Sequence, residues 1–293
     1  MPTGVTLNTF FRDQYRKLCW AFIHSGPRRD VTVPTANGLL TVDSKDWLVG
    51  KYLYVRREHE TEEMRKAIAL LRRGGFLKNS GTLMNVGANL GMTCIGAIKL
   101  GYFKRAIAFE PEPNNFRLLC HNTRQNGLQD QIDCFQIALS STDGEMELEI
   151  SEDNSGDHRL RSSANPGFFR EERRRTIAVQ AKTLDSVLAS DARLRDESVN
   201  LVWMDIQGHE GHFFQGAQGF FSRAVPVISE FWPYGMERAG TPPAAFCETV
   251  AKLFTHFYVI SEGVKRPIGE IANLFSAYRE PRQVCLIALV REQ

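Results

Sequence analysis

The stretch Leu83-Met-Asn-Val-Gly-Ala-Asn-Leu-Gly91 decides the fold. It opens with a short apolar run typical of a strand, and the residues from Met92 to Leu100 that follow it predict a helix ending at Gly101. Small residues between a strand and a helix let the backbone turn sharply, and the helix N-terminus offers free N–H groups to a ligand. The stretch therefore predicts a ligand-binding turn.

An acidic residue follows this turn at the spacing of a nucleoside site. Residues 106–109 predict a second strand, and Glu110 stands at its tip, 23 residues after Gly87. A carboxylate near an offset of about 20 residues can accept both hydroxyls of a ribose. Dinucleotide sites favour glycine where Asn89 stands, so a ligand without phosphates, such as S-adenosylmethionine, suits this turn better. We expect the cofactor-binding residues to be Asn85, Gly87, Asn89, Gly91 and Glu110.

Strand-like and helix-like runs alternate after the turn, which predicts an α/β fold with a parallel sheet. The predicted helix is 114–126, and the predicted strands are 132–139, 201–204, 225–229, 257–261 and 284–290. Strict alternation of polar and apolar residues over 145–150 predicts a half-exposed antiparallel strand. A polar stretch at 151–176 follows it, and loops of that length are usually lids, binding loops or insertions.

The first eighty residues form an elaboration before the main fold. Residues 38–57 contain two short strand-like runs, and residues 60–73 have the apolar spacing of an amphipathic helix. We expect an N-terminal elaboration at 1–80 and a Rossmann-like domain at 81–293.

Acidic and aromatic residues follow two later strands and suggest the reacting part of the site. Asp205 comes directly after the run 201–204, and ligands of open α/β sheets bind beyond the carboxyl ends of the strands. Asp205 or His209 can act as a general base, whereas helix capping by Asp205 and a structural role for His209 are the alternatives. Candidate acceptor-binding residues are Glu210, Glu230, Trp232 and Tyr234. Asp205 and Glu210 alone make a poor cation site, so we expect no metal.

Composition excludes several classes of protein. The chain has 293 residues and a net charge of only +2, which disfavours a nucleic-acid partner. No apolar run approaches the roughly 18–20 residues that a bilayer requires, so we expect no membrane partner. Six cysteines without a Cys-x-x-Cys pair fit a reducing, cytoplasmic setting. The oligomeric state stays open.

Several separated motifs resemble the FkbM-type methyltransferase family. Residues 86–91 resemble its "vGANiG" loop, Phe109-Glu110-Pro111 its "fEP" motif, and residues 205–210 its "DvEGhE" motif. Asn115, Asn122 and Asn126 match its asparagine series, Thr183-Leu184-Asp185 its "tLD", and Gly216-Ala217 its "kGa". The chain departs from the family at Asn85, where Asp is common, and at Trp203 and Gln207, where Lys and Glu are frequent.

This resemblance implies a Rossmann-like class I methyltransferase, with a mostly parallel seven-stranded sheet and helices on both faces. It also implies S-adenosylmethionine as cofactor and a hydroxyl of a sugar, glycan or natural-product small molecule as acceptor. The alternatives are an NAD-dependent oxidoreductase on a similar fold and a catalytically silent S-adenosylmethionine-binding module.

Overall fold

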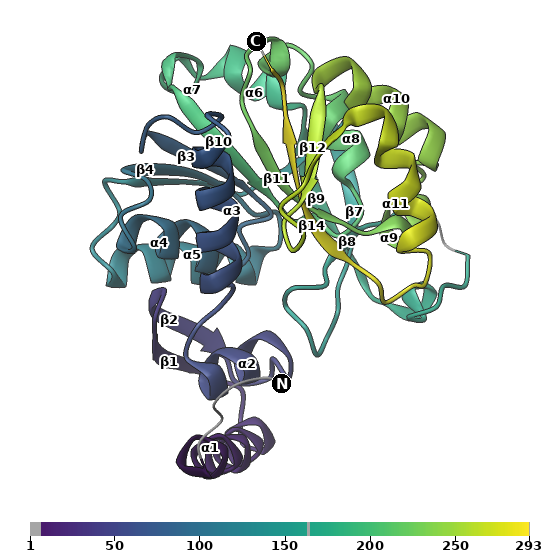
Figure 1. Cartoon of the computed structure of the whole chain (residues 1–293). Coiled ribbons are helices and arrows are strands. Elements are labelled where there is room, and N and C mark those ends of the chain that lie inside the picture. Colours follow the sequence, from purple (N-terminus) through teal and green to yellow (C-terminus); the bar gives the residue numbers. More distant parts are fainter. Residues whose placement is uncertain (1–6, 163–164, 293) are drawn as a thin grey trace.

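The computed structural model of the chain describes residues 7–162 and 165–292 (Figure 1). Residues 1–6 of the predicted elaboration and residues 163–164 of the predicted polar loop lie outside the described residues, as does residue 293.

A large sheet with the order β13-β12-β14-β11-β10-β3-β4-β5 forms the centre of the molecule. Its strands in chain order are β3 (Thr82–Val86), β4 (Arg105–Phe109), β5 (Ile132–Phe135), β10 (Val199–Met204), β11 (Val227–Phe231), β12 (His256–Val259), β13 (Lys265–Pro267) and β14 (Cys285–Val290). The neighbouring strands β5, β4, β3, β10 and β11 pair in parallel, whereas β14 is antiparallel to both of its neighbours, β11 and β12. This arrangement confirms the mostly parallel α/β sheet.

The sheet has one strand more than the expected seven. The chain turns at Glu262 and Gly263, whose N–H groups both donate to the carbonyl of Val259, and β13 then runs back antiparallel to β12. This short hairpin adds the eighth strand at the edge.

Helices cover both faces of the sheet, so successive residues of a central strand pack into two different cores. Leu83 of β3 packs into one core, and its neighbour Met84 packs into the other. The first core contains residues of α3 (Thr61–Arg73), α4 (Met92–Lys99) and α5 (Pro113–Gln125). The second contains residues of α6 (Leu184–Ser190), α8 (Glu210–Gln215), α10 (Pro243–Leu253) and α11 (Ala272–Ala277). Shorter helices are α7 (Ala192–Asp196), α9 (Pro233–Arg238), η1 (Glu171–Arg173), η2 (Phe220–Ser222) and η3 (Ile268–Ile271).

A second sheet, with the order β6-β9-β7-β8, lies between β5 and β10 in the chain. It comprises β6 (Ala138–Leu139), β7 (Gly144–Glu149), β8 (Arg159–Leu160) and β9 (Thr176–Lys182). The antiparallel strand predicted over 145–150 is confirmed as β7. The single strand predicted over 132–139 is wrong: β5 ends at Phe135, opposite the last residue of β4, and the chain then enters the second sheet as β6.

The N-terminal segment forms α1 (Leu7–Ser25), the hairpin β1 (Asp30–Thr35) and β2 (Gly38–Asp43), and α2 (Val49–Arg56). The second strand-like run predicted before residue 57 is wrong because this stretch is helical. Its buried residues Gly50 and Leu53 lie three apart, and Gly50 passes close to the buried ring of Trp20 in α1. In the described part of the chain, no helix combines the length and the apolar character that crossing a bilayer requires.

Asparagine side chains of α5 hold the hairpin against the main fold. Fully buried Asn122 accepts a hydrogen bond from the N–H of Thr41 and donates to the carbonyls of Thr41 and Leu90. Asn126 accepts from the N–H of Leu39 and donates to its carbonyl. These amides replace the missing strand partner of β2, so the hairpin is fixed beside the turn that follows β3.

Candidate functional site

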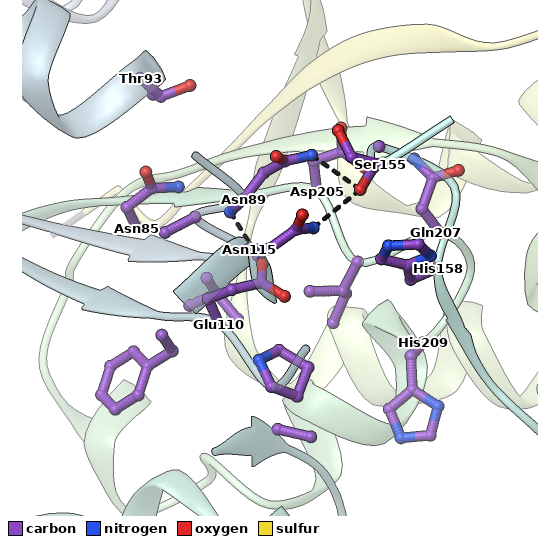
Figure 2. Close-up of a pocket in the computed structure, with 18 of the residues that line it drawn as sticks. Asn85, Asn89, Thr93, Glu110, Asn115, Ser155, His158, Asp205, Gln207 and His209 are labelled. Carbon is purple, nitrogen blue, oxygen red and sulfur yellow. Dashed lines mark hydrogen bonds between the residues drawn. The ribbon is translucent and has the colours of Figure 1, made fainter. Parts of the chain in front are cut away.

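A cleft opens where the chain leaves neighbouring strands in opposite directions. β3 and β10 are adjacent, but the chain continues from β3 to β4 on one side and from β10 to β11 on the other. Ligands of open α/β sheets bind in the crevice outside the carboxyl ends of strands at such a point. The cleft there holds about 970 Å³ of space, its open mouth included (Figure 2).

The turn after β3 forms one wall of this cleft. Gly87 has a φ of 77°, and an added Cβ would lie 1.9 Å from the carbonyl oxygen of Asp205, so only glycine fits between the two strand ends. Asn89 lines the cleft with a φ of 50°. Gly91 begins α4 behind the turn, where an added Cβ would meet Leu119 at 2.8 Å. Gly91 therefore shapes the turn from outside the cleft lining.

Glu110 lies at the tip of β4 and is held by main-chain donors. One carboxylate oxygen accepts a hydrogen bond from the N–H of Asn89 at 2.8 Å, and the other accepts from the N–H of Glu112 at 2.9 Å. The carboxyl group is buried, and this burial raises its pKa to about 7. Each carboxylate oxygen keeps a further lone pair, so the group can still accept two hydroxyl protons from a ligand.

The predicted polar loop closes over the turn. The carbonyl of Ser155 accepts hydrogen bonds from the side-chain amides of Asn89 and Asn115, at 3.0 and 2.9 Å (Figure 2). Asp153 of the same loop accepts from the N–H groups of Trp47 and Leu48. The loop is thus tied to the N-terminal segment and to α5 at once.

Two amide oxygens beside the cleft are left without a partner. Asn85 donates to the carbonyl of Trp203 and Asn89 to that of Ser155, yet within the described residues the buried Oδ1 atom of each accepts no hydrogen bond. Buried polar atoms are normally satisfied, so these oxygens point to a ligand that carries N–H or O–H donors.

Asp205 faces the turn from the end of β10. Its side chain accepts a 2.6 Å hydrogen bond from the amide of Gln207, which also donates to Glu230 at 3.2 Å. Burial and the neighbouring Glu60 raise the pKa of Asp205 to about 6, and burial raises that of Glu230 well above its usual range. Glu230 is not among the residues that line the cleft and lies behind Gln207. Gln207 therefore places a neutral amide between two carboxylates.

The N-terminal segment brings His59 and Glu60 into the cleft, which sequence reasoning missed. Both residues line the cleft, and Glu60 has a φ of 48°. Asn37 of the β1–β2 turn clamps the main chain of His59, accepting from its N–H and donating to its carbonyl. In residues 7–162 and 165–292 the His59 imidazole makes no hydrogen bond; its nearest charged contact is Glu60 at 4.0 Å. The sequence gives no signal for this pair beyond an ordinary polar turn.

His209 is buried too deeply in the cleft to be a freely accessible general base. It lines the floor of the cleft but is only 2% exposed, and its Nε2 is 2.9 Å from the hydroxyl of Ser140. Burial lowers its pKa to about 3, so the imidazole is neutral at ordinary pH. Glu210, fully buried, accepts hydrogen bonds from the N–H groups of Ile206 and Gly208 and is not among the cleft-lining residues. It therefore supports the loop that carries Asp205 and Gln207.

Trp232 and Tyr234 hold the polar loop and are also absent from the cleft lining. The Arg159 guanidinium lies 4.4 Å from the Trp232 ring centre and binds Glu171, which is itself hydrogen-bonded by the Tyr234 hydroxyl. The same hydroxyl accepts from the N–H of Phe168. Trp232 and Tyr234 therefore lie outside the cleft, where they hold the polar loop in place. Among the described residues, no three His, Cys, Asp or Glu side chains converge as a metal site.

The sheet order, with its reversed β14 and its cleft between the ends of β3 and β10, defines a Rossmann-like class I methyltransferase fold. Residues 85–257, more than half of the chain, match the family described as the methyltransferase FkbM domain. The chain therefore belongs to the FkbM methyltransferase family, as the sequence motifs predict.

A curated relative and several solved structures are similar to the chain, among them the following. The 2-O-methyltransferase NoeI of Sinorhizobium fredii is 22% identical over 157 residues, which cover 51% of this chain and 62% of that protein. A methyltransferase FkbM structure from Methylobacillus flagellatus has a TM-score of 0.41 and 13% identity, over 82% of this chain and 52% of that one. Precorrin-6y C5,15-methyltransferase from Geobacter metallireducens has a TM-score of 0.40 and 10% identity, over 79% and 88%.

Proposed function

We propose that the protein is an S-adenosylmethionine-dependent methyltransferase that methylates a hydroxyl oxygen of a sugar, glycan or natural-product small molecule. The observation that carries this proposal is the placement of Glu110 and Asp205 in one cleft, at the ends of the two strands that flank β3 at the switch point of the sheet. Membership of the FkbM family supports methyl transfer, and the relative named a 2-O-methyltransferase supports a hydroxyl acceptor.

The residues of the cleft fit this cofactor. Glu110 has two oxygens fixed by main-chain N–H groups, each with a lone pair left for a ribose hydroxyl. The unpartnered Oδ1 atoms of Asn85 and Asn89 can accept N–H donors, such as those of the amino-acid end. When bound, S-adenosylmethionine supplies a methyl group activated by a sulfonium.

The chain itself aligns the acceptor and removes its proton. Alignment of two reactants can contribute about 7–11 kcal/mol to the lowering of a barrier. Asp205 is the proton acceptor in this proposal, since its raised pKa of about 6 leaves it anionic at neutral pH yet more basic than an ordinary aspartate. His59 also lines this cleft. Burial lowers the pKa of its imidazole, which makes no hydrogen bond within the described residues, whereas the imidazole of His209 already contacts Ser140.

Calorimetry with S-adenosylhomocysteine tests the cofactor half of the proposal. In Glu110→Gln the new amide group must face the N–H of Asn89 or Glu112, so we expect affinity to fall by at least about tenfold, or 1.4 kcal/mol. The matched control is Glu145→Gln at an exposed position of β7, which should bind like the unchanged protein. Equal affinities in all three proteins would contradict the proposed site, and a thermal shift by NAD instead would favour an oxidoreductase.

Mass spectrometry tests the acceptor half. A glycan and metabolite extract incubated with methyl-labelled cofactor should yield a species that gains one methyl group on oxygen. Cofactor binding without any labelled product would favour a silent binding module.

A further inference from the structure

Helix α1 presents an apolar face to solvent. Its large side chains Phe10, Phe11, Tyr15, Leu18 and Phe22 are 50%, 66%, 69%, 72% and 77% exposed. Residues 11, 15, 18 and 22 follow one another at intervals of four, three and four, so they form one stripe along the helix. Single exposed apolar residues are ordinary, but a contiguous stripe marks an interaction surface.

The opposite face of α1 fixes the helix to α2, so the apolar stripe is held outward. Trp20 is fully buried, Asp13 forms an ion pair with Arg56 at 3.1 Å, and Arg16 donates to the carbonyl of Val55 at 2.9 Å. Figure 1 shows α1 at the end of the N-terminal segment farthest from the main sheet. Within the described residues, the apolar stripe therefore does not pack into a core of the protein.

The charge around α1 is positive and distinct from that of the rest of the chain. Residues 7–30 contain five Lys or Arg and two Asp, a net charge of +3, whereas the whole chain has a net charge of only +2. Both acids are paired, Asp13 with Arg56 and Asp30 with Arg117. Exposed Arg12 and Lys17 lie on the two sides of the apolar stripe.

We propose that α1 binds the surface of an anionic lipid bilayer, with its apolar stripe inserted at the boundary between headgroups and acyl chains. This proposal replaces the expectation of no membrane partner, which rested on the lack of an apolar run long enough to span a bilayer. Aromatic and aliphatic side chains on one face, flanked by Lys and Arg, are what an interfacial helix requires. A second copy of the helix fits less well, because each copy would bring Arg12 and Lys17 and no free acid to pair with them.

This surface lies one helix away from the cleft. α1 packs on α2, and Val49 at the start of α2 lines the cleft. Binding at α1 therefore places the cleft close to the bilayer, whatever acceptor the cleft takes.

Co-sedimentation with vesicles tests the proposal. We expect the full chain to pellet with vesicles that contain phosphatidylglycerol, more weakly with pure phosphatidylcholine, and less as salt rises. The combined variant Phe11→Ser, Leu18→Ser, Phe22→Ser should bind at least about tenfold more weakly. The matched control, Leu100→Ser, Val264→Ser, Val284→Ser, changes three exposed apolar residues outside the N-terminal segment and should bind unchanged.

All six substituted side chains are exposed, so equal melting temperatures verify that both variants fold. Absence of binding to anionic vesicles would overturn the proposal. So would light scattering that finds a dimer dissociated by the α1 variant alone, since the stripe would then join two copies of the chain.

Discussion

At the scale of single residues, the unusual feature is a group of carboxylates that share few compensating charges. Asp205 and Glu230 are linked by the amide of Gln207, and Glu60 enters from the N-terminal segment. Burial raises the pKa of Asp205 and of Glu230. Buried carboxylates with raised pKa values are common at catalytic sites because they are stronger bases than exposed ones.

The pH dependence of turnover should report Asp205. A base works only when deprotonated, so kcat should rise through about pH 6, the pKa of Asp205, and level off above it. Asp205→Asn should lower kcat by about 10²–10⁴ with little change in S-adenosylhomocysteine affinity. Equal losses of turnover and affinity would mean that Asp205 only supports the turn.

Gln207→Leu is the companion variant for this measurement. It removes the amide that stabilises the charged form of Asp205, so the rising limb should move to higher pH. A limb that stays in place would assign the titration to a different group.

At the scale of elements, the asparagines of α5 explain how a short two-stranded hairpin stays fixed. An isolated hairpin is marginally stable in water, but the amide of Asn122 satisfies main-chain groups of both Thr41 and Leu90. Asn122 belongs to the asparagine series that matches the family motif. At this position the motif residue therefore forms the hydrogen bonds that join the hairpin to the main fold.

Asn122→Ala should lower the free energy of unfolding by about 2–4 kcal/mol, because two buried carbonyls and one N–H lose their partner. Asn114→Ala on the same helix is the control, since among the described residues the Asn114 side chain accepts hydrogen bonds from Arg117 alone, near the surface, and its loss should cost less than about 0.5 kcal/mol. Denaturant melts of the two variants measure the difference. Similar losses would show that the Asn122 hydrogen bonds are replaced by water.

Sequence patterns predicted most elements of the main sheet because its central strands are buried on both faces and flanked by glycine or a polar turn, whereas the short edge strand β13 is mostly exposed. These patterns failed where contacts with residues distant in the sequence decide the secondary structure. Residues 51–57 alternate like a strand but form a helix under Trp20, and residues 132–139 divide where β4 ends and can no longer pair. Neither partner is visible from local sequence.

At the scale of the whole molecule, the N-terminal segment contributes Val49, His59 and Glu60 to the lining of the cleft. Sequence motifs pointed to Glu110, Asp205 and the turn after β3, which line the cleft, because those residues directly follow strands. They could not locate Val49, His59 or Glu60, which reach the cleft only through the hairpin and its contacts with α5. The predicted division at residue 80 also separates α3 from the core that it covers.

We therefore expect a chain shortened to residues 81–293 to be unstable. It would expose the sheet face covered by Met64, Ile68 and Leu71 of α3, which are almost fully buried. Residues 27–293, which lack only α1 and what precedes it, should keep cooperative melting and S-adenosylhomocysteine binding. Thermal melting with and without that ligand distinguishes them, and a cooperative, ligand-stabilised 81–293 would show that the two segments are independent.

The two main-chain N–H groups that grip Glu110 have a kinetic consequence. A carboxylate anchored by main-chain N–H groups has already lost its rotational freedom, so the nucleoside of the proposed cofactor should meet a carboxylate that need not rearrange. The association rate should then be set by diffusion into the cleft, and differences in affinity among nucleoside analogues should arise mainly from how fast each one dissociates.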